Sequence, residues 1–266
     1  SGHLGNLCLP KRLTLKLPND VPLTLALVPV GLFAMGSPAE EAGRGADEGP
    51  LRRLRADVAF YISTTEVTQE QYEAVTGHNP SRFRDGRLPV EQVNWEEAVE
   101  FCELAGEKLG KLVRLPTEAE WECAARAGTR TPFSTGETIS PQQASYDGTY
   151  AYGAGPKGAY RLGPVPAGHL PPNAWGLHEM HGNVWEWCAD AYAAYPGGVT
   201  CGPTQWERGP YRVVRGGCWR SYPWHCRSAV RMGCDPRLRD RTVGFRVICE
   251  PDVVPPPRLD KTGARR

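Results

Sequence analysis

Signals for the start of a helix occur three times in this chain, and all three precede residue 128. Each is a Thr or Asn followed three residues later by a Gln or Glu, and such a pair can satisfy free amide groups in a first helical turn. The pairs are Thr68 with Gln71, Asn94 with Glu97, and Thr117 with Glu120. After Gly128, the residues Gly, Pro, Trp and Tyr dominate and no strong helical period appears. We therefore expect an α+β fold with its helices in the first half, followed by short strands and long ordered loops.

Other segments predict strands and loops. Residues 21–36 alternate apolar and polar residues before a turn, and residues 58–62 form a short apolar run, as strands do. Residues 39–50 are charged and Gly-rich, which indicates an exposed loop. The expected organisation is an N-terminal extension (1–20), one domain (21–250) and a C-terminal tail (251–266).

Size and charge narrow the classes of function. With 266 residues, the chain can bury one large core or two small ones. Its net charge of +1 gives no overall attraction to nucleic acid or to an anionic membrane. No apolar run reaches the roughly 18 residues that a membrane span needs. We see no signal peptide, which favours the cytoplasm, although an exported or surface-attached mature chain would look the same.

The nine cysteines are expected to be mostly reduced. No two of them form a Cys-x-x-Cys pair, so a zinc site of that kind is not indicated. Cys102, Cys123 and Cys188 lie within apolar periodic segments and are expected to pack as small hydrophobic residues.

A series of ordered segments across residues 25–250 resembles the formylglycine-generating enzyme (sulfatase-modifying factor) superfamily. The segments are Phe33-Ala34-Met35-Gly36-Ser37-Pro38, Glu66-Val67-Thr68 with Gln71-Tyr72, Arg114-Leu115-Pro116-Thr117-Glu118-Ala119-Glu120-Trp121-Glu122, Asn173-Ala174-Trp175-Gly176-Leu177, Gly182-Asn183-Val184-Trp185-Glu186-Trp187, Arg215-Gly216-Gly217 and Gly244-Phe245-Arg246-Val247. The resemblance implies a single irregular, loop-rich α+β domain of the C-type-lectin-like type. Most of these residues are of types that cap, turn or pack, so we interpret them as scaffold.

The resemblance also implies a calcium site. In calcium-holding relatives the matching positions supply one side-chain oxygen, two backbone carbonyls and an acidic side chain. Carried over, the ligands are Glu179, the carbonyls of Gly182 and Val184, and Glu186. The alternative is that Glu186 caps a turn or forms a local ion pair. His178 and His181 do not form the zinc-protease pattern, because they are three residues apart and that pattern needs four.

The catalytic cysteines of the superfamily have no counterpart here. The resemblance implies two cysteines, five residues apart, that follow the Arg-Gly-Gly turn and bind copper(I), a metal suited to thiolates. Counted from Gly217, the first position is Ser221, and counted back from Arg231 the second falls near Pro223. Cys218 and Cys226 are present but lie eight residues apart rather than five. We therefore expect no catalytic residue of this kind, no copper, and no formylglycine synthesis.

Residues 218–242 contain no Lys, Glu or Gln. This composition resembles the variable region of proteins diversified by retroelements, in which mutagenesis at adenines cannot produce those residues. Trp224 and Met232 need another origin. The alternative is a structural loop that simply lacks these residues.

On this interpretation the segment forms a binding face. Its predicted contact residues are Cys218, Arg220, Ser221, Tyr222, Trp224, His225, Val230, Gly233, Cys234, Leu238, Asp240 and Thr242. Aromatic and Arg side chains are the types enriched at binding hot spots, so the expected ligand is a protein.

Two other hypotheses stay open. One is an oxidoreductase-type maturation enzyme on the same fold, such as the siderophore-maturation oxidases or the iron-dependent sulfoxide synthases. The synthases need a histidine cluster from an additional helical domain, which we do not find in the sequence. The other is an accessory subunit without chemistry of its own.

Overall fold

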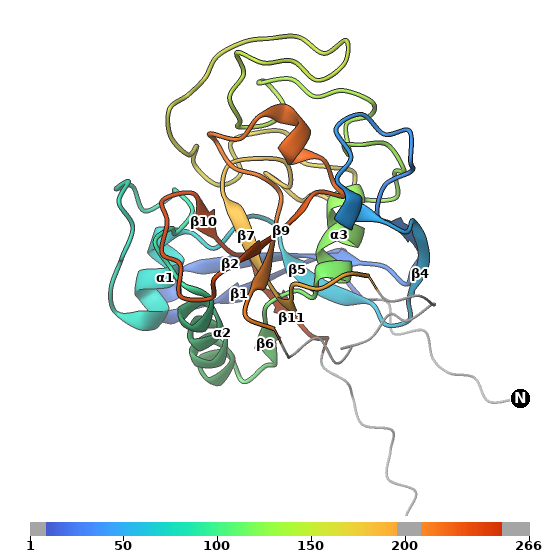
Figure 1. Ribbon diagram of the computed structural model, residues 1–266. Coiled ribbons are helices and arrows are strands. Elements are labelled where there is room, and N and C mark those ends of the chain that lie inside the picture. Colours follow the sequence, from blue (N-terminus) through green and yellow to red (C-terminus); the bar gives the residue numbers. More distant parts are fainter. Residues whose placement is uncertain (1–8, 196–208, 252–266) are drawn as a thin grey trace, which may run out of the picture.

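The computed structural model describes residues 9–195 and 209–251. It contains the helices α1 (Gln69–Thr76), α2 (Trp95–Leu109) and α3 (Glu118–Arg126), with short 3-10 turns η1 (Pro18–Asp20), η2 (Ala46–Glu48) and η3 (Pro223–Cys226). The strands are β1 (Arg12–Lys16), β2 (Pro22–Val28), β3 (Gly31–Met35), β4 (Arg52–Ala56), β5 (Phe60–Ser63), β6 (Val113–Arg114), β7 (Trp185–Ala191), β8 (Arg212–Arg215), β9 (Arg231–Cys234), β10 (Val243–Gly244) and β11 (Ile248–Cys249). They form a five-stranded sheet in the order β1-β2-β5-β11-β6, a four-stranded sheet β10-β7-β8-β9 and the pair β3-β4 (Figure 1).

The three predicted helix starts are confirmed. Thr68, Asn94 and Thr117 are the N-caps of α1, α2 and α3, and each completes the reciprocal pair of hydrogen bonds with the residue three positions later. Within the described residues, no α-helix follows Arg126. The second half of the domain is therefore built from strands and ordered loops, as the sequence predicts.

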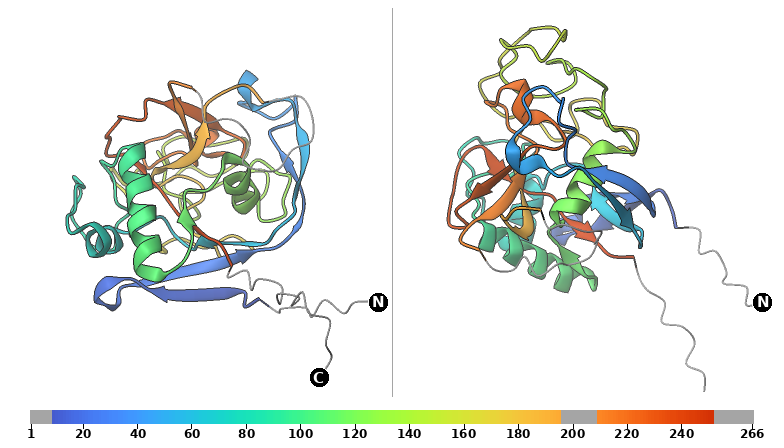
Figure 2. Two further views of the ribbon diagram at one scale, coloured as in Figure 1. Left: turned by 90° about the horizontal axis from the view of Figure 1, so that it is seen from below. Right: turned by 45° about the vertical axis from the view of Figure 1, so that its right-hand side comes forward.

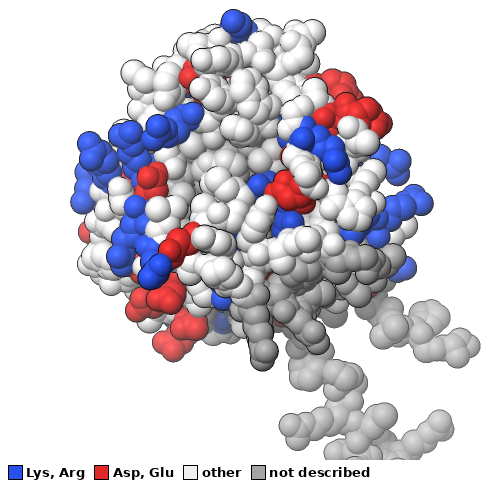
Figure 3. All heavy atoms as spheres, viewed as in Figure 1, with Lys and Arg blue, Asp and Glu red and all other residues white. Residues whose placement is uncertain are grey.

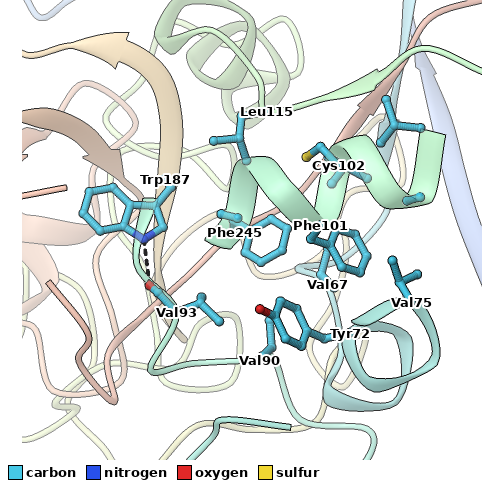
Figure 4. Packing of buried hydrophobic residues seen from close by; sticks show 14 of the residues in the cluster. Val67, Tyr72, Val75, Val90, Val93, Phe101, Cys102, Leu115, Trp187 and Phe245 are labelled. Carbon is cyan, nitrogen blue, oxygen red and sulfur yellow. Dashed lines mark hydrogen bonds between the residues drawn. The ribbon is translucent and has the colours of Figure 1, made fainter. Parts of the chain in front are cut away.

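Both faces of the five-stranded sheet are covered. Leu23 and Leu25 of β2 point to the side of α1 and α2, whereas Ala26 and Val28 point to the side of α3. This alternation follows from the two-residue period of a strand. On the first side, aromatic side chains from α1, α2 and β7 pack together (Figure 4), and Trp187 Nε1 donates to the Val93 carbonyl at 3.0 Å.

The predicted N-terminal extension is wrong for residues 12–16. These residues form β1, which pairs with β2 in antiparallel register from Arg12 opposite Ala26 to Lys16 opposite Pro22 (Figure 2). The strand is short, and its sequence Arg12-Leu13-Thr14-Leu15-Lys16 alternates polar and apolar residues, with Leu13 and Leu15 half-buried. Of the predicted tail, only Pro251 lies within the described residues.

No helix among the described residues is long and apolar enough to cross a membrane. The cysteines predicted to pack as small hydrophobic residues do so, since Cys102, Cys123 and Cys188 are all buried.

Candidate binding face

The segment between β8 and β9 carries most of the residues that the sequence assigns to binding. It leaves β8 through Gly216 and Gly217, whose φ angles of 95° and 79° favour glycine. A side-chain carbon at Gly217 would lie 2.7 Å from the Cys226 sulfur. The glycine therefore lets the chain fold back closely over η3.

The inner side of this segment is fixed to α3 by buried ion pairs. Arg215 pairs with Glu122, and Arg231 donates to both oxygens of Glu118 at 2.6 and 2.7 Å. The exposed fraction of the Arg215 side chain is 0%. Removing one member of such a pair leaves a buried charge without a partner, which is strongly destabilising. These contacts fix where the loop begins and ends.

A third arginine fixes the middle of the segment. Arg227 donates to Glu41 at 2.5 Å and to both oxygens of Glu48 at 2.7 and 2.8 Å. Its guanidinium also donates to the Gly43 carbonyl at 2.6 Å. Figure 2 (right) shows the loop around η2 lying beside η3. The prediction that residues 39–50 form an exposed loop is therefore wrong for Glu41 and Glu48, whose side chains are 3% exposed.

The two thiols of the segment are buried. Cys218 is 2% exposed and Cys226 is 0% exposed. Burial raises the pKa of both thiols, that of Cys226 well above its ordinary value. Ser221, at the first catalytic position of the superfamily, accepts a hydrogen bond from the Cys218 amide at 3.0 Å. The thiols therefore stay protonated at neutral pH, which disfavours them as nucleophiles.

The outer side of η3 carries an aromatic cluster, which we define as Tyr150, Tyr222, Trp224 and His225. Tyr222 stacks on Trp224 with ring centroids 4.8 Å apart, and Tyr150 meets Tyr222 edge-on at 4.5 Å. His225 lies 6.0 Å from Tyr222. Tyr150 is 42% exposed and Tyr222 is 38% exposed. Few charged side chains surround this end of the molecule in the view of Figure 3. Large exposed rings in contact with one another are typical of interaction sites.

The structure divides the twelve predicted contact residues by burial. Arg220, Tyr222, His225 and Leu238 are exposed, and Trp224, Gly233 and Asp240 are half-buried. Cys218, Ser221, Val230, Cys234 and Thr242 are buried. For these five the assignment to a binding face is corrected, because their side chains pack inward. Asp240 has a structural contact as well, since it accepts hydrogen bonds from the amide and hydroxyl of Thr242 at 2.9 and 2.6 Å.

Tyr150 was not predicted as a contact residue. It lies in the loop that follows α3, far from η3 in the sequence, and the fold brings the two segments together. The neighbouring Tyr222 raises the pKa of Tyr150, which agrees with the close approach of the two rings. Only the density of tyrosines between residues 146 and 160 could have signalled this contribution.

Both acidic side chains predicted to bind calcium have hydrogen-bond partners within the protein. Glu186 is bound at both oxygens by Arg246, at 2.6 and 2.7 Å, and also accepts from Trp121 Nε1 at 2.6 Å. Glu179 accepts the amides of Gly168 and Leu170 at 2.8 and 2.9 Å. Glu186 thus forms a buried ion pair, with Arg246 as its partner. The carbonyls of Gly182 and Val184 complete the predicted set, and calcium binding stays a prediction.

A third carboxylate lies beside this pair. Glu66 is fully buried, and its Oε1 atom accepts from Asn183 Nδ2 at 3.0 Å. Burial, together with the charges of Glu179 and Glu186, raises the pKa of Glu66 well above its ordinary value. Across residues 9–195 and 209–251, no group of three or more His, Cys, Asp or Glu side chains is arranged to hold a metal ion. The raised pKa favours the protonated form of Glu66.

Comparison with known proteins places the chain in a family. Residues 15–251 match the family described as "Sulfatase-modifying factor enzyme 1-like domain". The chain belongs to this family. The match confirms the resemblance seen in the sequence, and it includes part of β1.

Proteins of different kinds are similar to this chain. The formylglycine-generating enzyme of Streptomyces coelicolor is 31% identical over 85% of this chain and 89% of that protein. The solved structure of PvdO from Pseudomonas aeruginosa is 31% identical with a TM-score of 0.76, and the match covers 90% of this chain and 98% of that one. Treponema denticola variable protein 1 is 27% identical with a TM-score of 0.76, over 91% and 100% of the two chains.

A longer protein also contains this domain. The serine/threonine-protein kinase pkn1 of Chlamydia pneumoniae is 30% identical over 86% of this chain, which spans only 38% of the length of that kinase. The chain is thus similar to most of the length of some proteins and to a part of another. Its fold is the single loop-rich α+β domain that the sequence predicts.

Proposed function

We propose that this member of the sulfatase-modifying factor family binds a protein ligand through the aromatic cluster and is not itself a catalyst. The observation that carries the proposal is the exposure of the contacting rings of Tyr150 and Tyr222, with Tyr222 on a segment that Arg227 fixes from within. Aromatic side chains on a rigid support lose little conformational entropy on binding, which favours affinity. The likeness to Treponema denticola variable protein 1 supports a binding role.

The site chemistry supports a role other than two-cysteine oxidation. The first catalytic position is the hydroxyl of Ser221, and the nearby thiols Cys218 and Cys226 are enclosed in the core. A thiolate is the form that attacks substrates or binds soft metals, and burial opposes its formation here. Binding needs no such group, because exposed rings contribute through contact area alone.

A more specific form of this proposal is that a retroelement diversifies the exposed residues of the binding face. Variable positions need exposed side chains, and Arg220, Tyr222, His225 and Leu238 meet that condition. The buried members of the predicted set would have to stay constant. A reverse transcriptase gene and a near-copy of the 218–242 coding segment beside this gene would support it. Related genes that vary equally at buried and exposed codons would contradict it.

The binding proposal can be tested by site-specific cross-linking. A photoreactive phenylalanine analogue is placed at Tyr222, and the same analogue at Tyr211 serves as a control, since Tyr211 is 49% exposed but lies outside the cluster. We expect the first variant alone to capture a discrete protein partner. Trp224→Ala should then weaken binding of that purified partner at least tenfold, as for a hot-spot residue. Equal capture at both positions, or unchanged affinity, would contradict the proposal.

A maturation enzyme on the same fold is the second candidate. The 31% identity to a formylglycine-generating enzyme supports it. Cys226→Ala discriminates between the two, because a thiol-dependent reaction would be lost whereas binding through the aromatic cluster would be retained. Any thiol-dependent turnover that disappears in this variant would favour the enzyme.

A further inference from the structure

Four arginines form a basic patch beside the aromatic cluster. The patch consists of Arg82, Arg84, Arg220 and Arg241. We propose that it docks an acidic polypeptide segment of the protein ligand. This inference rests on the proposed binding function and adds the chemistry of the partner.

A buried tryptophan holds the patch together. Phe83 meets Trp219 edge-on with centroids 5.8 Å apart, and Arg82 and Arg84 flank Phe83 in the chain. Arg220 follows Trp219, and the guanidinium of Arg241 lies 5.4 Å from the centre of the Trp219 ring. Trp219 itself is 3% exposed. Three loops are thus fixed around one ring, and each of them carries at least one of the four arginines.

The charges of the patch are unbalanced. Other arginines on these loops already have carboxylate partners: Arg87 with Asp85 at 3.2 Å, Arg237 with Asp235 at 2.7 Å, and Arg239 with Glu97 at 2.7 Å. Within the part of the chain that the structure describes, none of the four patch arginines has a carboxylate within salt-bridge distance. Arg82, Arg84 and Arg220 are exposed, and Arg241 is half-buried. On the left of Figure 3, over the loops that flank β10, Lys and Arg side chains gather with fewer acidic ones.

The carboxylate nearest to Phe83 is turned inward. Glu91 is buried and accepts the Phe83 amide at 2.8 Å, so it supports the loop from beneath. Arg84 Nη1 donates to the Asn79 carbonyl at 2.8 Å, which leaves the other N–H groups of its guanidinium for a ligand. Planar guanidinium groups bind carboxylates through two parallel hydrogen bonds, which makes an acidic partner the best chemical match.

A polypeptide fits better than a nucleic acid. Single-stranded nucleic acids bind by stacking their bases on exposed ring faces. Within the patch itself the faces of Trp219 are covered, since Tyr160 stacks on it at 6.2 Å and Arg241 lies over the ring, so the patch offers no ring of its own for stacking. Arg220 is two residues from Tyr222 in the chain, so the patch and the aromatic cluster share one segment. A protein ligand anchored on the aromatic rings would present neighbouring Asp and Glu residues to the arginines.

The test uses the full chain and a fluorescently labelled oligoglutamate peptide as the probe. Binding is measured by anisotropy at low and at physiological ionic strength. The patch variant is Arg82→Gln/Arg84→Gln/Arg220→Gln. Its matched control is Arg12→Gln/Arg53→Gln/Arg55→Gln, which removes the same charge from exposed positions on β1 and β4. We expect a loss of about tenfold or more in the patch variant and less than about twofold in the control, with weaker binding at higher salt.

Several outcomes would overturn the inference. An equal loss of oligoglutamate affinity in both triple variants would show that the peptide is attracted by the overall charge of the protein and not by the patch. Tighter binding of single-stranded oligothymidylate than of oligoglutamate, lost in the patch variant, would identify a nucleic-acid surface instead. If a partner cross-links at position 222 and binds the patch variant with unchanged affinity, the aromatic cluster stands as the binding site and the acidic-segment inference fails.

Discussion

The two sides of residues 215–231 differ in what their side chains contact. On the inner side, Arg215, Arg227 and Arg231 are enclosed by carboxylates from α3 and from the loop around η2. On the outer side, Tyr222 and His225 contact mainly other aromatic rings and are exposed. A single short segment thus serves as framework and as surface. The lesson is that the outer residues can be exchanged without disturbing the contacts that fix the loop.

The largest effect is expected when a buried ion pair on the inner side of the segment is removed. Glu122→Ala takes away the carboxylate between Arg126 and Arg215 and the acceptor for the Gly36 amide. Because two buried guanidinium groups then lose that partner, we expect the free energy of unfolding to fall by about 3–5 kcal/mol. Urea denaturation measures the change.

A surface ion pair provides the control for Glu122. Lys16 and Asp20 lie 3.0 Å apart with side chains 75% and 81% exposed. Lys16→Ala should cost less than about 1 kcal/mol. If Glu122→Ala does not fold, Glu122→Gln keeps an acceptor for the Gly36 amide and should still destabilise. A cost for both Glu122 variants as small as that of Lys16→Ala would show that the inner ion pairs do not hold the segment.

An intermediate effect is expected from pH, through a histidine beneath the aromatic cluster. His181 Nδ1 donates to the Cys226 carbonyl at 2.8 Å, and Nε2 accepts the Ser134 amide at 3.0 Å. Burial, with a smaller effect of Arg126, lowers the pKa of His181 to about 4. The neutral ring is therefore the folded form, so its stabilisation is complete above about pH 6.5 and is lost as the pH falls toward 4. The loss is on the order of 3 kcal/mol.

The measurement must separate His181 from an opposing group. Burial, together with the charge of Glu118, raises the pKa of Asp190 to about 6, so Asp190 makes the fold less stable as the pH rises from about 4 to 6. Thermal unfolding of His181→Gln is therefore compared with that of the unaltered chain between pH 4 and 7. We expect the thermal stability of the variant to fall less between pH 7 and pH 4 than that of the unaltered chain. Parallel pH curves would show that His181 titrates normally.

Local signals in the sequence predicted the helices correctly, whereas distant contacts were missed. The capping pairs of Thr68, Asn94 and Thr117 lie within four residues, so the information is contiguous. The burial of Glu41 depends on Arg227, which is 186 residues away in the chain. No window of sequence contains both members of that ion pair, so a charged loop looked exposed.

The binding face was predicted in part for a related reason. Residue type suggested which side chains favour contact with a ligand, but it gave no direction for each one. Residues 218–226 have no regular period, and Ser221 turns inward whereas Tyr222 turns outward. Tyr150 comes from another loop and could be assigned only once the fold placed it against Tyr222. The composition of a loop thus identifies a candidate surface, and the fold selects its members.

The smallest effect on stability is expected for a substitution on the outer side of the segment. Tyr222→Ala removes an exposed ring that contacts Trp224 and Tyr150, and such contacts contribute about 0.5–1.5 kcal/mol. We expect the free energy of unfolding to fall by about 1 kcal/mol. Phe133→Ala is the matched buried control: its ring is fully buried beneath the cluster and contacts His181 and Tyr152, so it should cost about 3–5 kcal/mol. Urea denaturation of both variants measures the two changes in the free energy of unfolding. Similar changes would mean that Tyr222 is a structural residue of the segment and that its exposure is incidental to binding.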